Sequence, residues 1–485
     1  MTHTAHALAA AAALVSLAAA VPATAAETVE EVLRVLDRTR SVDASKESKS
    51  YPVIFDAYLE MTPPPMPIGP DFNLRTIHPG MSDWTKVSGW AESNGGMADA
   101  LLAVESKPLF GLPYNANALA SRYREASLTA EIGAGGSLRD NRFPYLDAID
   151  VIAAYATAES YRRFEAGNTQ GGLDLAVANI FLLRQCCDRE FLAEVMHTVD
   201  LLNGALTNLR DMLYTYRDTI SPDQCADLAI AKLPFLRPDR TRLLIPEGDR
   251  VVSEALIQEV FNSRGQPDRE KFASTFAEIQ SKTTPLTRFG AARRWRMIAD
   301  VHDSEEAALD RLRLVYDDWW RRWRVEEYDP ILDIPTQFDR TNPVRYAAVI
   351  YSMQDVQRLF DLRDQLVAQA HATAMAAGLV GYQSFYGNYP SSSDKMYAQF
   401  VRKRSDRDPF DTEFLPFKYR VLSERFPVDT PAGRIFIESE QAILYSKGQD
   451  HQDDRGSVTS ADGADGDIVF WPPVQTLLRE AGRID

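Results

Sequence analysis

The sequence predicts a mainly α-helical protein: a body of helical hairpins followed by a small α+β domain, in which one long helix lies on a short antiparallel sheet. Two observations predict this class. Apolar residues recur at helical spacing through most of residues 147–313, and the later stretch "FKYRV" alternates apolar and charged residues with the period of a strand. The chain has 485 residues, enough for two or three domains. We expect the helical body in residues 27–330, the α+β domain in residues 345–475 and a C-terminal tail in residues 476–485.

The composition is that of a soluble globular protein, with 45% hydrophobic and 25% charged residues. The formal net charge is −16. Nucleic acids and anionic lipids are bound through clustered Lys and Arg, so this charge argues against either partner binding across a broad basic face. We therefore expect no nucleic acid partner, and we expect protein partners to bind a groove of the helical-hairpin body.

The first 26 residues resemble a secretory signal peptide. An apolar, Ala-rich stretch from Ala7 to Val21 is followed by Pro22 and by small residues that predict cleavage near Ala25 or Ala26. No Lys or Arg precedes the apolar stretch, which departs from the usual pattern. The alternative is an uncleaved anchor, but the stretch is short and only weakly hydrophobic. We expect export to the periplasm or the extracellular space, with no transmembrane segment in the mature chain.

Three cysteines, Cys186, Cys187 and Cys225, leave two readings open. In an exported chain, one of the adjacent pair could form a disulfide with Cys225. Alternatively, all three are buried small apolar side chains on helices. Their spacing fits no metal site.

The first elements are indicated by short local signals. Residues 27–50 begin with the amphipathic pattern "ETVEEVLRVLDRTR", which predicts a helix, and the proline-dense residues 60–72 predict an extended connection. Residues 149–187 predict a helical hairpin that resembles one tetratricopeptide-type unit, with Gly167 capping the first helix and the later glycines in the turn. These signals predict helices joined by short turns.

Two further helices follow. "SPDQCADLAIAKL" carries helix-start chemistry, with Ser221 as the N-cap, Pro222 at the first position and Gln224 three residues after the cap. Another helix is expected over about residues 249–261.

A stripe of aromatic and leucine side chains marks the segment "LDRLRLVYDDWWRRWR". Such stripes can form sugar-binding or membrane surfaces, but they more often belong to a hydrophobic core with a solvated cationic flank, and we favour the core. The stripe comprises Leu309, Leu312, Tyr316, Trp319, Trp320 and Trp323.

The C-terminal third of the chain has a different residue pattern, with one helix followed by strands. A long amphipathic helix is expected to end at Gly378, and strands are expected in "FKYRV" and on both sides of "ESEQ", where the two runs predict a hairpin. A loop rich in aspartate then leads into the apolar run "DIVFW". The helix has apolar residues along one face: Val349, Met353, Val356, Phe360, Val367, Ala370 and Ala374.

Four landmarks in this third resemble the globular head of type II secretion major pseudopilins. They are "YP" at residues 389–390, "DPFD" at 408–411, "LYSKGQD" at 444–450 and "DGDI" at 465–468, in the order of that family. Two features depart from it: the hydrophobic N-terminal helix with a glutamate near its start is missing, and Asp411 stands where the family has Gly. The whole chain also looks like exported helical proteins of planctomycete-type bacteria, a resemblance that indicates no activity.

The resemblance implies a calcium site in the aspartate loop. It implies Asp450, Asp465 and Asp467 as side-chain ligands with a backbone carbonyl near residues 444–446, and Asp453 and Asp454 as further ligands. Calcium takes six to eight oxygens in flexible geometry, which a loop dense in Asp and Gly can supply. The alternative is a solvated loop without an ion.

The sequence holds no clear catalytic motif. Glu194 and His197 form one E-x-x-H pair, but helical di-metal sites need a second pair, so we interpret His197 as structural. Our first hypothesis is therefore an exported, non-enzymatic scaffold or interaction protein with a calcium-stabilised pseudopilin-like domain, assisting secretion or envelope assembly. The alternative is an exported glycan-acting hydrolase with carboxylates on the helical body and tryptophans that stack on sugars.

Overall fold

The computed structural model describes residues 29–39, 45–133, 138, 141–236, 244–283, 288–325, 329–397, 399–403, 405–413, 415–460 and 463–484. The predicted signal peptide in residues 1–26 lies outside them. The helices are α1 Val29–Thr39, α2 Tyr51–Leu59, α3 Trp84–Ser93, α4 Gly95–Val104, α5 Ser121–Glu125, α6 Tyr145–Glu165, α7 Thr169–Cys186, α8 Leu192–Thr215, α9 Pro222–Ala226, α10 Gly248–Glu259, α11 Arg269–Thr283, α12 Arg288–Ala299, α13 Glu305–Arg324, α14 Ala347–Ser352, α15 Gln357–Tyr386 and α16 Val474–Glu480. The strands are β1 Lys418–Val421, β2 Phe426–Thr430, β3 Gly433–Ile437, β4 Ala442–Ser446 and β5 Ile468–Trp471.

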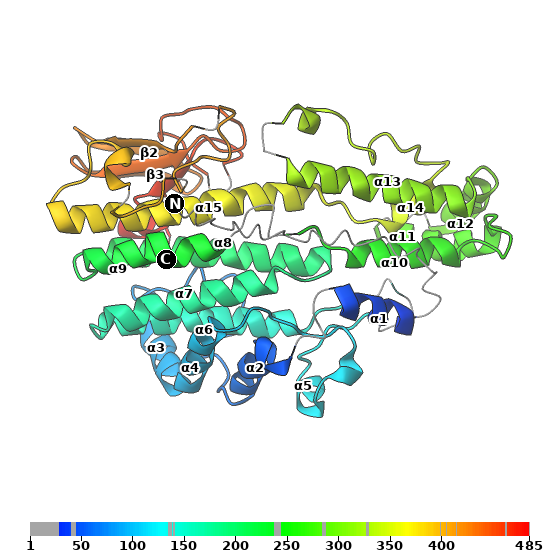
Figure 1. Ribbon diagram of the computed structural model, residues 1–485, viewed down its shortest axis with the longest axis horizontal. Coiled ribbons are helices and arrows are strands. Elements are labelled where there is room, and N and C mark those ends of the chain that lie inside the picture. Colours follow the sequence, from blue (N-terminus) through cyan, green and yellow to red (C-terminus); the bar gives the residue numbers. More distant parts are fainter. Residues whose placement is uncertain are drawn as a thin grey trace, which may run out of the picture.

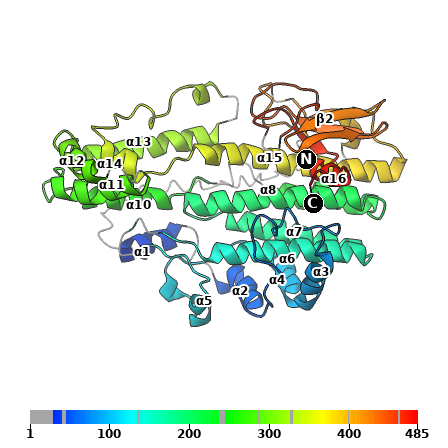
Figure 2. The same ribbon diagram turned by 180° about the vertical axis from the view of Figure 1, so that it is seen from behind.

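Two long helices, α8 and α15, form the axis of the molecule. They lie side by side, with α6 and α7 on one side and the strands on the other (Figure 1), and the view from behind gives the same order (Figure 2). Helices α10 to α14 gather at one end of this axis. The predicted class is confirmed: a mainly helical protein with a long helix on a small antiparallel sheet.

The local helix signals are confirmed at two turns. Gly167 has a left-handed φ of +76° between α6 and α7, a conformation that glycine adopts without strain. Ser221 and Gln224 form the reciprocal capping box at the start of α9. The later glycines of the hairpin lie inside α7 and not in the turn. At Gly172 a side chain would approach the ring of Phe164 to 2.7 Å, so the glycine there serves the close packing of α6 on α7.

The expected end of the long helix at Gly378 is wrong. The helix is interrupted at residues 353–356, so that α14 and α15 are separate, and α15 then runs through Gly378 to Gly387, whose φ is +79°. A Cβ at Gly378 would lie 2.4 Å from a methyl carbon of Val401. The glycine is therefore a packing contact, which a sequence pattern cannot distinguish from a helix cap.

The expected hairpin around "ESEQ" is also wrong. β3 pairs with β2, while β4 pairs on one side with β1 and on the other with β5. Both edges of β4 are therefore occupied, and β3 belongs to a second, two-stranded sheet. Strand β2 was not predicted from the sequence, because it contains Pro427 and proline is disfavoured at a central strand position.

The three-stranded sheet is covered on both faces. Leu444 and Phe470 join the main core on the side of α15, whereas Ile443 and Val469 join a smaller core beneath β2, β3 and α16. This explains why β4 and β5 are buried along their whole length.

The helical body and the sheet are tied together through α8. The buried guanidinium of Arg210 donates to Thr373 Oγ1 of α15 at 2.6 Å, and Thr476 of α16 donates to Asp211 Oδ1 at 2.7 Å. Both α15 and α16 are thereby anchored to the same helix.

The three cysteines are free and buried, as the second of the two readings expects. Burial raises the pKa of each thiol, to about 12 for Cys187 and Cys225. They are therefore apolar packing groups with little thiolate character.

Candidate functional site

The aspartate loop between β4 and β5 folds back on itself. Gln449 N donates to the carbonyl of Gly463 at 3.0 Å, and Thr459 pairs with Asp467 in a short bridge. Gly448 has a φ of +72°, and a Cβ there would lie within 2.6 Å of the carbonyl oxygens of Gly463 and Gly466. Because only glycine permits this approach, the two ends of the loop are held together by their backbones.

The structure does not gather the predicted ligands Asp450, Asp465 and Asp467 into one set. Asp450 is partly exposed and its Oδ1 accepts from Gln452 N at 2.9 Å, and Asp465 is exposed. Within the described part of the chain, no three His, Cys, Asp or Glu residues are arranged closely enough to hold a metal ion. Asp462, a further aspartate of this loop, lies outside the described residues.

The carboxylates that lie near Asp467 are instead those of Asp453 and Asp454, which raise its pKa. Asp467 is fully buried, and its Oδ2 accepts from Gly456 N at 2.6 Å. Its Oδ1 is also buried and has no hydrogen-bond partner in the described structure. Burial is the main cause of its raised pKa of about 7, since the backbone donors do not compensate it.

Tyr445 of β4 borders this carboxylate cluster. Its hydroxyl donates to Asp453 Oδ1 at 3.0 Å, and burial together with Asp453 and Asp467 raises the pKa of its phenol. The main influences on the pKa of Asp467 are therefore burial, Asp453, Asp454 and backbone N–H groups, with no cationic side chain among them, whereas the charge of Asp453 also acts on Lys447. We call these three aspartates the Asp467 cluster.

A second buried pair of carboxylates lies nearby and carries its own cation. Lys447 Nζ is 2.8 Å from Asp411 Oδ2, and the charges of Asp411, Asp453 and Asp408 add to this bond in raising the pKa of the lysine. Burial opposes ionisation of Asp411, but Lys447 and two backbone N–H groups outweigh it and lower the pKa of Asp411. Asp411 therefore differs from Asp467, because the Asp411 carboxylate has the ammonium group of Lys447 beside it.

Asp408 connects this pair to the strand. Its Oδ1 accepts from Ser446 Oγ at 2.7 Å and from Phe410 N at 3.0 Å, and burial raises its pKa to about 6. Sequence reasoning missed both Asp408 and Lys447 as site residues. The signal available was that Asp408 and Ser446 belong to two of the four landmarks.

The E-x-x-H pair does not form a joint site. Glu194 is fully buried, and its two oxygens accept from Tyr114 Oη at 2.6 Å, Tyr145 Oη at 2.7 Å and Arg189 Nε at 2.9 Å. His197 bonds instead to Asp150, at 2.9 Å, which raises the pKa of the imidazole. The structural interpretation of His197 is therefore supported.

The tryptophan stripe of α13 belongs to the core, as we favoured. Trp319 and Trp323 are buried, and the partly exposed Trp320 donates from its indole nitrogen to Glu247 Oε1 at 2.5 Å. Two of the three tryptophans are therefore unavailable for stacking on a sugar. The alternative of a glycan-acting hydrolase relied on these exposed rings, so this observation argues against it.

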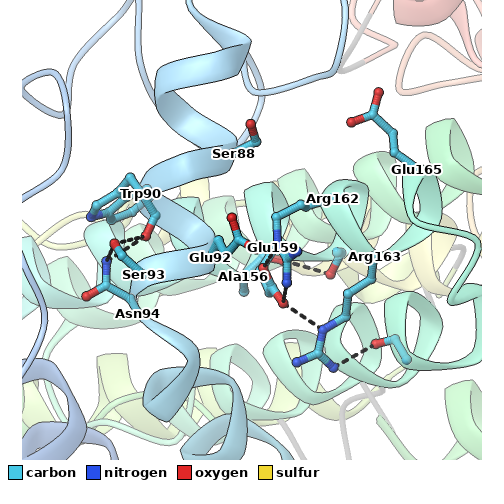
Figure 3. A network of polar contacts seen from close by, with 12 residues as sticks. Ser88, Trp90, Glu92, Ser93, Asn94, Ala156, Glu159, Arg162, Arg163 and Glu165 are labelled. Atoms are coloured by element: carbon cyan, nitrogen blue, oxygen red, sulfur yellow. Dashed lines mark hydrogen bonds and ion pairs between the residues drawn. The ribbon is translucent and has the colours of Figure 1, made fainter.

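Another buried carboxylate, Glu159 of α6, is saturated by two arginines. Figure 3 shows it between Arg162 and Arg163, whose Nε atoms lie 2.7 and 2.8 Å from its oxygens. Arg162 is also 3.7 Å from Glu92 of α3. Since its oxygens are engaged within the protein, this network ties α3 to α6 and offers no free base.

Comparison of the chain with family models, with curated proteins and with solved structures finds no match. Every described helix is too short or too polar to span a lipid bilayer.

Proposed function

We propose that the chain is an exported, non-enzymatic scaffold or interaction protein that assists secretion or envelope assembly. In this proposal, residues 345–475 form a pseudopilin-like head that calcium stabilises and that presents the protein to its protein partners. Export rests on the signal-peptide pattern of residues 1–26.

The contacts among the four landmarks support the pseudopilin-like head. Asp408 of "DPFD" bonds to Ser446 of "LYSKGQD", and Gly448 packs on Gly463 and Gly466 next to "DGDI". The "YP" landmark lies beside the end of β5, because Trp471 Nε1 donates to the Tyr389 hydroxyl at 3.4 Å. Landmarks spread over about eighty residues thus meet around β4 and β5.

The buried, unpartnered Oδ1 of Asp467 is the observation that carries the calcium proposal. Asp467 would be the buried carboxylate that holds the ion, and carbonyl oxygens and water would complete the shell that calcium requires. When bound, the ion supplies the positive charge that allows Asp467 to be ionised while buried. The contacts of Gly448 and Gln449 with Gly463 then keep the two ends of the loop together.

Affinity capture from the envelope fraction, done in calcium and in chelator, tests the function. We expect a reproducible set of envelope proteins in calcium and a weaker set in chelator. Capture of no envelope protein in calcium would refute the interaction role, and an identical set in both conditions would refute the part played by calcium.

A further inference from the structure

Bonds that join an Asn or Asp to a following Gly can rearrange without an enzyme. The glycine nitrogen attacks the carbonyl carbon of the preceding side chain, an intramolecular reaction that the absence of a glycine side chain leaves unobstructed. The chain contains four such bonds: Asn94–Gly95, Asn203–Gly204, Asp462–Gly463 and Asp465–Gly466. The structure describes both residues of all of them except the third.

The fold protects the two Asn–Gly bonds. Asn94 is buried, and its side-chain amide donates to Trp90 O at 2.7 Å and accepts from Thr62 N at 2.8 Å. Asn203 is also buried and lies with Gly204 inside α8, where backbone N–H groups bond within the helix. Either asparagine can therefore react only after its helix has opened locally.

The Asp465–Gly466 bond is held by no such contacts. Asp465 is exposed, and its carboxylate makes no hydrogen bond or ion pair with a described residue. The Gly466 N–H likewise donates no hydrogen bond within the described part of the chain. Glycine is nevertheless required here, because its φ is +116° and a Cβ would lie 2.9 Å from a methyl carbon of Val458. The side chain and the nitrogen that must meet are thus both unengaged.

We propose that Asp465 is a site of spontaneous isomerisation to isoaspartate. The Gly466 nitrogen forms a bond to Cγ of Asp465, the carboxyl group loses its hydroxyl oxygen, and this oxygen departs as water with the amide proton. The product is a five-membered succinimide. Water then opens the ring, and opening at the main-chain carbonyl leaves Gly466 attached through Cγ. One water is released and one is consumed, so the rearrangement needs no other reactant.

The rearrangement lengthens the main chain by one atom directly before Gly466. On the far side of this bond, Asp467 N donates to Val458 O at 3.0 Å. The Gly466 carbonyl oxygen would lie only 2.6 Å from a Cβ at Gly448, so the two segments are closely packed. An extra main-chain atom displaces these contacts, and isomerisation therefore loosens the loop that holds the buried Asp467.

Ageing of the full chain in chelator at pH 7 tests the proposal, with peptide mass spectrometry after digestion as the readout. Electron-transfer fragmentation distinguishes isoaspartate from aspartate, and deamidation of an asparagine is recognised by its gain in mass. The same chain unfolded in urea reports the reactivity of each bond without the fold. D462E is aged beside the wild type, because it removes the neighbouring Asp462–Gly463 bond from the peptide that contains Asp465.

In the folded chain, isoaspartate should accumulate at Asp465 at least about tenfold faster than Asn94 or Asn203 deamidates, because the asparagines react only after local opening. In urea the order should reverse, since an amide is a better electrophile than an ionised carboxylate. D465E should lose the signal, because its longer side chain would have to form a six-membered ring. The proposal is overturned if the folded wild type and D462E form no isoaspartate at Asp465, if either asparagine reacts faster there, or if the order is the same in urea.

Discussion

The pH dependence of the calcium effect follows from the burial of Asp467. Its pKa is raised from an ordinary value of 3.8 to about 7, chiefly by burial and then by Asp453 and Asp454. At 1.36 kcal/mol for each unit of pKa, this shift corresponds to a loss of about 4 kcal/mol in the free energy of unfolding when Asp467 is ionised. The value is an upper limit because the loop can relax. The folded protein binds the extra proton, so in chelator its stability falls as the pH rises from about 4 to 7.

Calcium should reverse this loss, because it binds the ionised carboxylate. We expect calcium to raise Tm by several degrees at pH 8 and by much less at pH 5, where the proton already neutralises Asp467. The assay is thermal unfolding followed by circular dichroism at both pH values, in calcium and in chelator.

Asp467→Asn removes the charge of the side chain but keeps its size and shape. In chelator at pH 8 the variant should unfold at a higher temperature than the wild type, because the amide carries no buried charge and can donate toward Asp453 and Asp454. Calcium should no longer change its Tm. The exposed Asp465→Asn is the matched control and should behave as the wild type. A wild type indifferent to calcium at pH 8, together with a destabilised Asp467→Asn, would refute the reasoning.

Three further predictions concern buried charge and packing, and each is measured by chemical denaturation. Glu194→Gln should cost about 3–5 kcal/mol, because it leaves a buried guanidinium without its carboxylate partner; a loss below about 1 kcal/mol would contradict this. Lys447→Met should cost about 2 kcal/mol by removing the cation beside Asp411, and Asp411→Asn in the same chain should restore part of it. Gly378→Ala should cost about 1–3 kcal/mol by overpacking, whereas Gly89→Ala in α3, with no atom within 4 Å of a new Cβ, should be neutral or stabilising.

Features set by neighbouring residues were predicted well from the sequence. The capping box at Ser221 and the left-handed Gly167 depend on residues within one helical turn, so their chemistry is visible in a short window. The core position of Trp319 and Trp323 follows from helical periodicity in the same way.

Features set by distant residues were not predictable. The failure of the β3–β4 hairpin reflects occupation of both edges of β4 by β1 and β5, strands that lie on opposite sides of it in the sequence. Likewise, which carboxylates lie beside Asp467 depends on how residues 448–460 and 463–466 are arranged, and that arrangement depends on contacts of Gly448 with two remote carbonyls. A spacing pattern could indicate an acidic loop but could not say which of its aspartates meet.

Isothermal titration of the chelator-treated chain with calcium at pH 8 tests the central claim most directly. The account predicts one bound calcium ion per chain, weaker binding at pH 6 and no binding to Asp467→Asn. Absence of saturable heat from the wild type, or equal affinity in Asp467→Asn, would contradict it.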